Sequence, residues 1–253
     1  MNPVTVRNVK IGEGIPKICV SIIGKKKQEI LASAYEIKKQ KVDMAEWRVD
    51  WFEMVHDLKQ VQEILKELRN VLEKIPLLFT FRTKAEGGEA EISSDEYVAL
   101  NKMAAGSGDV DLVDVELFSM QEVSKQLIYQ IHECGVKVVA SNHDFEKTPK
   151  KNDIVERLCQ MQEAGADVLK IAVMPHDTKD LLELLVATEE MNRVHAKCPV
   201  VAMSMSKVGV ASRLLGEVFG SAITFGAIGE VSAPGQVDAK SLRNMLEMIH
   251  KFS

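Results

Sequence analysis

The chain has 253 residues, of which 46% are hydrophobic and 27% charged, so it carries enough apolar material for an ordinary globular core. Its formal net charge of −5 and the absence of a basic stripe argue against a nucleic-acid partner. No stretch approaches the roughly 18 uninterrupted apolar residues of a membrane span, and residues 1–7 lack the apolar centre of a signal peptide, so no membrane association and a cytoplasmic location are expected.

The predicted elements begin with residues 4–15, where apolar and polar residues alternate and Gly12 and Gly14 favour a turn. Short apolar runs rich in β-formers then recur, and successive runs begin roughly 22 to 35 residues apart, the repeat of a strand followed by a helix. The runs cover residues 17–22, 44–49, 77–81, 112–116, 136–140, 168–173, 200–203 and 222–225. Between them, segments with helical spacing have start signals at Ser93, Thr178 and Val237.

Eight strand-plus-helix units in about 250 residues predict an α/β protein of the (β/α)₈ TIM-barrel class. Residues 4–15 are then a short N-terminal β-hairpin that closes the bottom of the barrel. A doubly wound open sheet is the alternative, but no GxGxxG motif follows the first strand, which weakens a dinucleotide-binding interpretation. No linker or composition shift divides the chain, so residues 1–253 are expected to form a single barrel domain.

Lys170 stands out because it lies inside an apolar strand, where lysine is rare. Burial disfavours a charged ammonium and lowers the pKa of an amine from its free value of about 10.4, which prepares it for Schiff-base chemistry with a ketone or aldehyde. The structural alternative is a lysine that reaches from the strand end to solvent.

In a barrel, the active site lies at the C-terminal ends of the strands. Polar or sulfur-containing side chains mark those ends, and several lie two residues apart and therefore on one face of a strand. They are Ser21, Glu46, Arg48, Thr80, Arg82, Glu86, Asp114, Glu116, His143, Lys170, Met203 and Met205, followed by the glycine-containing loop 226–236.

Structural interpretations compete with functional ones. Glu46 and Arg48 could form one buried ion pair, His143 could be a satisfied structural histidine, and Arg213 could be a solvated surface residue. Taken together, however, one lysine, one histidine, carboxylates and several arginines converge on one barrel mouth. Arginines around Lys170 would further disfavour its ammonium form, and they also imply an anionic substrate.

The motifs that carry these residues resemble those of the type I 3-dehydroquinate dehydratases of the shikimate pathway. The resemblance covers nearly the whole chain, with the motifs in the same order. They are EWRVD at 46–50, FTFRTKAEGG at 79–88, SNHDF at 141–145, KIAVMP at 170–175, MSMS at 203–206 and SAPGQ at 232–236.

The resemblance implies a role for each matching residue. Lys170 matches the lysine that forms an imine with the substrate ketone, His143 the general base and acid, and Glu86 the carboxylate that orients it. Arg213 matches the arginine that holds the substrate carboxylate. The other matching substrate-binding positions are Ser21, Glu46, Arg48, Arg82, Ser232 and Gln236, of which the last two belong to a lid over residues 228–236.

The resemblance further implies a homodimer that uses no metal and no organic cofactor and dehydrates 3-dehydroquinate to 3-dehydroshikimate by syn elimination. Two other functions stay open at this stage. Another Schiff-base barrel lyase or aldolase would share Lys170 but should bind a phosphorylated substrate, for which Gly209 and Gly226 offer a site. A catalytically silent binding barrel is the third, and the intact Lys170 and His143 argue against it.

Overall fold

The computed structural model describes residues 2–40, 42–229 and 235–252. Its strands are β1 (Val4–Val6), β2 (Val9–Ile11), β3 (Lys17–Ile22), β4 (Met44–Arg48), β5 (Leu77–Thr80), β6 (Leu112–Glu116), β7 (Lys137–Asp144), β8 (Val168–Val173), β9 (Val200–Ser204), β10 (Ile223–Ala227) and β11 (Val237–Asp238). Its helices are α1 (Lys27–Lys39), η1 (Val49–Trp51), α2 (Leu58–Leu72), η2 (Lys84–Glu86), α3 (Ser94–Gly106), α4 (Gln121–Glu133), α5 (Lys151–Glu163), α6 (Thr178–Glu190), η3 (Met191–His195), α7 (Val210–Leu214), α8 (Gly216–Phe219) and α9 (Ala239–Phe252). Within these ranges, no helix has the length and apolar character needed to cross a membrane.

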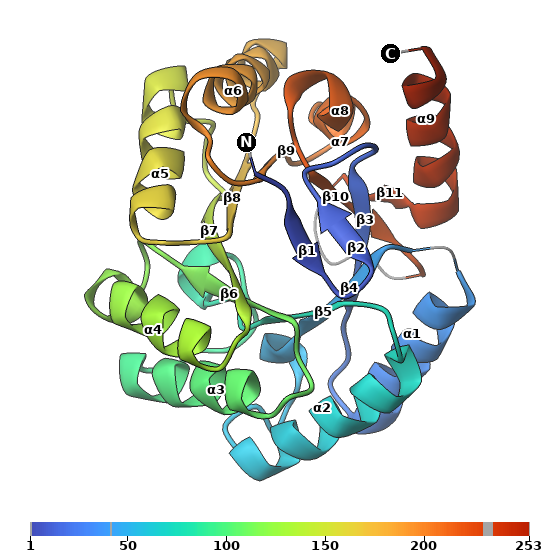
Figure 1. Cartoon of the computed structure of the whole chain (residues 1–253), viewed down its shortest axis with the longest axis vertical. Coiled ribbons are helices and arrows are strands. Elements are labelled where there is room, and N and C mark those ends of the chain that lie inside the picture. Colours follow the sequence, from blue (N-terminus) through green and yellow to red (C-terminus); the bar gives the residue numbers. More distant parts are fainter. Residues whose placement is uncertain (1, 41, 230–234, 253) are drawn as a thin grey trace.

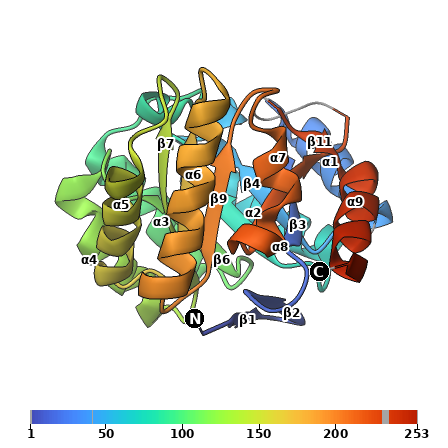
Figure 2. The ribbon, with the colours of Figure 1, turned by 90° about the horizontal axis from the view of Figure 1, so that it is seen from above.

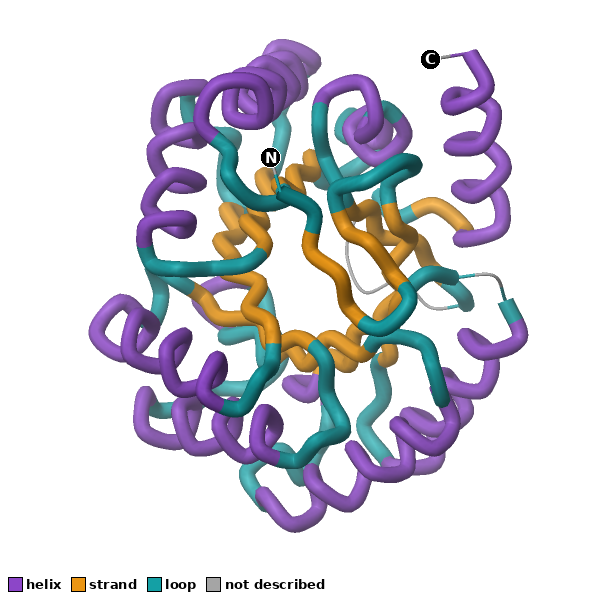
Figure 3. The backbone as a smooth tube through the Cα atoms, viewed as in Figure 1, coloured by secondary structure: helices purple, strands orange, loops and turns teal. Residues whose placement is uncertain are grey.

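The parallel strands curl into a ring, and the helices pack around its outside (Figure 1). The order of the sheet is β11-β10-β3-β4-β5-β6-β7-β8-β9, and the tube view shows the strands encircling a centre (Figure 3). The ring closes between β9 and β10, where Val200 bridges Ser221 and the amide of Ala222 donates to the carbonyl oxygen of Val200 at 2.7 Å. The predicted barrel is thus confirmed, and the doubly wound open sheet is wrong.

The predicted N-terminal hairpin is also confirmed. β1 and β2 pair antiparallel and lie across one end of the barrel (Figure 2). Val6 and Ile11 from the hairpin join the apolar residues that fill that end of the barrel interior. Arg7, in the turn, donates to Asp111 Oδ1 at 2.7 Å and so attaches the hairpin to the segment before β6. The end closed by the hairpin offers no access to substrate, which leaves the opposite end for a site.

The predicted strands agree with the structure within a few residues, with one informative difference. β7 extends to Asp144, whereas residues 136–140 were expected, so His143 lies on the strand and not after it. The extension forms because Ser141 pairs with Lys170 and His143 with Ala172 on β8, which satisfies the backbone of a polar run.

The predicted N-cap residue is correct for one helix and off by one position for another. Ser93 caps α3, and its hydroxyl accepts from the amide of Glu96, as its start signal predicts. The cap of α6 is Asp177 and not Thr178, because the Asp177 carboxylate accepts from two amides, those of Lys179 and Asp180.

Candidate active site

The inner face of most barrel strands changes from apolar to polar along its length, whereas β9 and β10 stay apolar with Met203 and Phe225. On β4, Met44 is followed two residues later by Glu46, and on β8, Val168 is followed by Lys170. Alternate residues of a strand share a face, so the apolar members fill the hairpin end and the polar members converge on the opposite end. This is the C-terminal end of the strands, where barrel enzymes hold their active sites.

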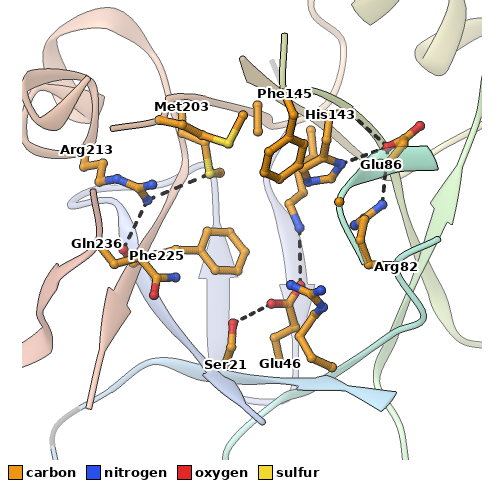
Figure 4. Close-up of a pocket in the computed structure, with 15 residues that line it drawn as sticks. Ser21, Glu46, Arg82, Glu86, His143, Phe145, Met203, Arg213, Phe225 and Gln236 are labelled. Carbon is orange, nitrogen blue, oxygen red and sulfur yellow. Dashed lines mark hydrogen bonds and ion pairs between the residues drawn. The ribbon is translucent and has the colours of Figure 1, made fainter. Parts of the chain in front are cut away.

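A pocket lies at this end (Figure 4). The sequence-predicted residues that line it are Ser21, Glu46, Arg48, Arg82, Glu86, His143, Lys170, Arg213 and Gln236. Met203 and Met205, which the sequence also places at a strand end, line it as well, and its other lining residues are Gly87, Phe145, Ala172 and Phe225. Ser232 lies outside the described residues, as does most of the expected lid, so the structure brings together every predicted site residue that it describes.

Lys170 is 4% exposed, and its Nζ is 3.3 Å from both Glu46 Oε1 and Asp114 Oδ2. The ammonium also lies 4.6 Å from the centre of the Phe225 ring. The sequence analysis expected arginines around Lys170 to disfavour its ammonium form, but the charged groups in contact with the ammonium are two carboxylates. Two carboxylates stabilise the positive charge because a buried cation needs a counter-charge.

The neighbours of Glu46 hold its carboxylate in the ionised form. Its Oε2 accepts from the Ser21 hydroxyl at 2.7 Å, and its Oε1 accepts from the Thr80 hydroxyl at 3.0 Å. Burial alone would raise the pKa of Glu46, but the charges of Lys170 and Arg48 and the Ser21 hydrogen bond outweigh it and lower the pKa from 4.5 to about 2. The carboxylate is therefore a fixed negative charge at neutral pH.

Arg48 does not form the ion pair with Glu46 that the sequence allowed. It donates through Nε and Nη2 to the two oxygens of Asp50, each at 2.8 Å, in a bidentate contact. Burial opposes the charge of Arg48, but the Asp50 carboxylate outweighs it and raises the pKa of Arg48. The third guanidinium nitrogen, Nη1, takes no part in this contact with Asp50. Arg48 also lines the pocket.

Arg82 is buried among carboxylates, one of which also contacts Lys170. Its Nη2 is 2.9 Å from Asp114 Oδ1, and its Nη1 is 2.8 Å from Glu116 Oε1 and 3.5 Å from Glu86 Oε2. Burial works against its charge, but Asp114, Glu116 and Glu86 raise its pKa well above the ordinary value of a guanidinium. Asp114 thus contacts both Lys170 and Arg82 and joins two parts of the site electrostatically.

Glu86 and His143 form a hydrogen-bonded pair. Glu86 Oε2 lies 2.9 Å from both the backbone nitrogen and the Nδ1 of His143. Burial and the charges of Arg82, Lys170 and Arg48 lower the pKa of His143 well below 6.5, so the imidazole is neutral at pH 7. When Glu86 is ionised it accepts the Nδ1 proton, and the ring then carries its lone pair on Nε2 and can accept a proton there.

Gly87 supports the same wall of the pocket. It ends η2 with a positive φ of 81°, a conformation that favours glycine. A Cβ at this position would overlap the ring of Phe145, which lines the pocket two residues beyond His143. The absence of a side chain therefore lets Phe145 pack against the turn that follows Glu86.

Arg213 lies across the pocket from this pair, on α7 (Figure 4). It is 1% exposed, its Nη1 donates to the carbonyl oxygen of Phe225 at 3.4 Å, and burial lowers its pKa to about 10. Gln236 lies beside it. The structure thus places Arg213 in the pocket and not on the solvated surface.

Several residues that contribute to the site are not among those predicted from the sequence. Asp114 lies at a predicted strand end, two residues before Glu116 and on the same face, and this spacing is the sequence signal for its contribution. Asp50 pairs with Arg48 from η1, and Ser119 donates to Glu86 Oε1 at 2.6 Å from the turn after β6. Asp50 ends the EWRVD motif, which was the available signal for it, whereas nothing in the sequence around Ser119 distinguishes it from an ordinary loop residue.

A parallel barrel with a buried lysine, a neutral histidine bonded to a carboxylate, and arginines at its C-terminal mouth defines a (β/α)₈-barrel enzyme. A family model described as Type I 3-dehydroquinase matches residues 18–253. The chain belongs to the type I 3-dehydroquinase family, a family of hydro-lyases.

Similarity to individual proteins agrees with this assignment. The 3-dehydroquinate dehydratase of Clostridioides difficile (strain 630) is 56% identical over 248 residues, which cover 98% of this chain and 97% of that protein. The dehydratase of Syntrophotalea carbinolica is 52% identical and covers 99% of both chains.

Solved structures share the whole fold. A type I 3-dehydroquinate dehydratase from Clostridium difficile has a TM-score of 0.97 at 55% identity, over 100% of this chain and 99% of that one. A 3-dehydroquinate dehydratase from Geobacillus kaustophilus has a TM-score of 0.96 at 36% identity, over 100% and 98% of the two chains.

Proposed function

We propose that this chain dehydrates 3-dehydroquinate to 3-dehydroshikimate by syn elimination through an imine on Lys170. The observation that carries the proposal is the buried Lys170 Nζ, held by two carboxylates in a pocket that also contains the neutral His143. A ketone bound there would meet an amine and a base at the same time.

The covalent step explains why two carboxylates contact Lys170. The Lys170 ammonium first loses a proton to water, and the free amine attacks the C3 carbonyl carbon. The resulting carbinolamine takes up a proton on its hydroxyl and loses water to give a protonated imine. This iminium has the same single positive charge as the ammonium that Glu46 and Asp114 hold at 3.3 Å in the free protein. The site therefore stabilises the intermediate with charges that are already in place.

The elimination step assigns one base to two proton transfers. His143 Nε2 removes a proton from C2, which the iminium has made acidic, and the electron pair forms an enamine. The C1–O bond then breaks as His143 returns the proton to the departing hydroxyl, so that water leaves from the same face. Hydrolysis of the imine releases 3-dehydroshikimate and restores the amine, for a net loss of one water.

The remaining residues are assigned to substrate binding. Arg213 holds the ring carboxylate, which suits a planar guanidinium. Ser21, Glu46 and Arg82 contact substrate hydroxyls, and Arg48 does so through Nη1. Gln236 and Ser232 complete the site from the loop that follows β10, with residues 228–236 as its lid.

A related structure supports covalent chemistry in this family. The Clostridium difficile type I enzyme, 55% identical to this chain, was solved with covalently modified comenic acid, a carboxylic acid. The family resemblance further supports a single-domain, cytoplasmic homodimer that requires no metal and no organic cofactor.

The proposal is tested by mixing purified protein with 3-dehydroquinate and following the ultraviolet absorbance of the conjugated enone product. Wild-type protein is expected to raise the absorbance, and Lys170→Ala is expected to lose several orders of magnitude in rate. The matched control is Lys137→Ala. It removes a half-exposed lysine that pairs with Asp167 away from the pocket, so it should keep wild-type turnover. No reaction with wild-type protein, or equal rates for wild type and Lys170→Ala, would contradict the proposal.

A further inference from the structure

Glu86 receives hydrogen bonds from both sides of its carboxylate. Its Oε2 faces His143, while its Oε1 accepts from the Ser119 hydroxyl at 2.6 Å and from the Asn142 amide at 3.4 Å. Glu86 is only 2% exposed, whereas Ser119 is an exposed residue in the turn between β6 and α4. A surface hydroxyl therefore contacts the carboxylate that is bonded to the base.

The orientation of Asn142 is fixed from outside the pocket. Arg157, on α5, donates from Nη1 to Asn142 Oδ1 at 2.9 Å and lies 3.8 Å from Asp144 Oδ2. Because a guanidinium can only donate, the amide oxygen of Asn142 must point toward Arg157, and its NH₂ group must point toward Glu86. Both groups at Oε1 are therefore donors, and both favour the ionised carboxylate.

We propose that Ser119 and Asn142 are positioning residues for the dehydration: they hold Glu86 Oε1 so that Oε2 remains an ionised acceptor for the Nδ1 proton of His143. The inference rests on the proposed roles of Glu86 and His143. Neither Ser119 nor Asn142 lines the pocket, so they act on the reaction through Glu86 and do not touch the substrate.

The charges around Glu86 make this support necessary. Burial and the carboxylate of Glu116 raise the pKa of Glu86 to about 7, and Asp114 adds to the rise. Arg82, 3.5 Å away, and the Ser119 hydroxyl oppose it. A small further rise would leave Glu86 protonated at neutral pH, and a carboxylic acid would donate to His143 Nδ1 and place the ring proton on Nε2. The imidazole could then no longer accept the C2 proton.

Loss of the Ser119 hydroxyl should change the pH dependence of turnover. Turnover requires ionised Glu86, so it falls as the pH drops through the pKa of that group. Without the Ser119 hydroxyl this pKa is higher, and the acidic limb of the kcat profile moves to higher pH by about one unit, the scale of one lost hydrogen bond to a charged group. kcat at pH 7 should fall several-fold and recover by about pH 9, while KM changes little.

The test compares pH profiles of kcat and KM for wild type, Ser119→Ala, Ser119→Thr and Ser94→Ala, with 3-dehydroquinate as the substrate. Ser119→Thr keeps the hydroxyl and should restore the wild-type limb. Ser94 lies nearby, with its hydroxyl 4.0 Å from Met120 Sδ and no hydrogen bond to Glu86, and its alanine variant should match wild type. Asn142→Ala should shift the limb in the same direction as Ser119→Ala.

An unchanged limb in Ser119→Ala, an equal shift in Ser94→Ala, or failure of Ser119→Thr to restore the profile would overturn the inference. Glu86→Gln and His143→Ala show whether a failure concerns the positioning role of Ser119 and Asn142 or the proposed function itself. If both retain wild-type turnover, the assignment of the Glu86–His143 pair fails and the inference fails with it. If both lose turnover while Ser119→Ala keeps the wild-type profile, only the positioning role of Ser119 is excluded.

Discussion

Replacing Glu46 with glutamine removes one of the two carboxylates that hold Lys170, with little change in shape. In the native protein, Glu46 is 3% exposed and bonds to Ser21, Thr80 and Lys170. The amide keeps a hydrogen-bonding oxygen but loses the negative charge, so the buried ammonium retains only Asp114 as its counter-charge. Removing one partner of a buried ion pair is destabilising because the remaining charge is left desolvated.

The size of the loss follows from the pKa of Glu46, which falls from 4.5 to about 2 on folding. A depressed pKa stabilises the folded state above the unfolded value, and this contribution is lost as the pH falls toward the folded value. The difference corresponds to about 3 kcal/mol at pH 7 and about 1 kcal/mol at pH 3. Glu46→Gln is therefore expected to lower the free energy of unfolding by about 3 kcal/mol at neutral pH, a large part of the roughly 5–15 kcal/mol typical of a domain.

The assay is urea unfolding at both pH values, monitored by tryptophan fluorescence, since Trp47 and Trp51 lie in and beside the same strand. The control is Glu36→Gln, which breaks an exposed pair with Lys39 and should cost no more than about 1 kcal/mol. The destabilisation caused by Glu46→Gln should shrink between pH 7 and pH 3. A loss that is the same at both pH values, or no larger than that of the control, would refute the electrostatic reasoning.

Two further variants separate the remaining roles. His143→Ala leaves Lys170 able to attack the ketone but removes the base. The imine should therefore accumulate, as detected by mass spectrometry after borohydride reduction, while product formation falls about a hundredfold or more. Near-normal turnover would remove His143 from the mechanism. Arg213→Lys keeps the charge but loses the planar fork, so steady-state kinetics should show KM rising about tenfold or more with a smaller change in kcat. An unchanged KM would show that Arg213 does not hold the substrate carboxylate.

The fold was predictable because each barrel strand has a strong local pattern. Buried parallel strands form continuous apolar runs, and the regular spacing of those runs fixes the repeat. The site followed from the same geometry, since Glu46 and Lys170 occupy inner-face positions near the C-terminal strand ends. Strand ends were less predictable: β7 continues to Asp144 because β8 supplies partners for it, a tertiary effect that no local pattern records.

The choice of ion-pair partners could not be predicted. Arg48 is two residues from both Glu46 and Asp50, and only the turn of η1 brings Asp50 within 2.8 Å of it. Lys170 was expected to face arginines, but Asp114, 56 positions away in the chain, reaches its ammonium. Such pairings depend on side-chain distances between strands, and these distances are set by the barrel register and not by any local motif.

The covalent role of Lys170 is the central claim, and borohydride trapping tests it most directly. Wild-type protein is incubated with 3-dehydroquinate or its dehydration product, reduced with borohydride, digested and analysed by mass spectrometry. Reduction should add one ligand mass to the peptide that contains Lys170 and to no other, and Lys170→Ala should acquire none. Ligand mass on a different lysine, or none on wild-type protein that turns over its substrate, would contradict the account.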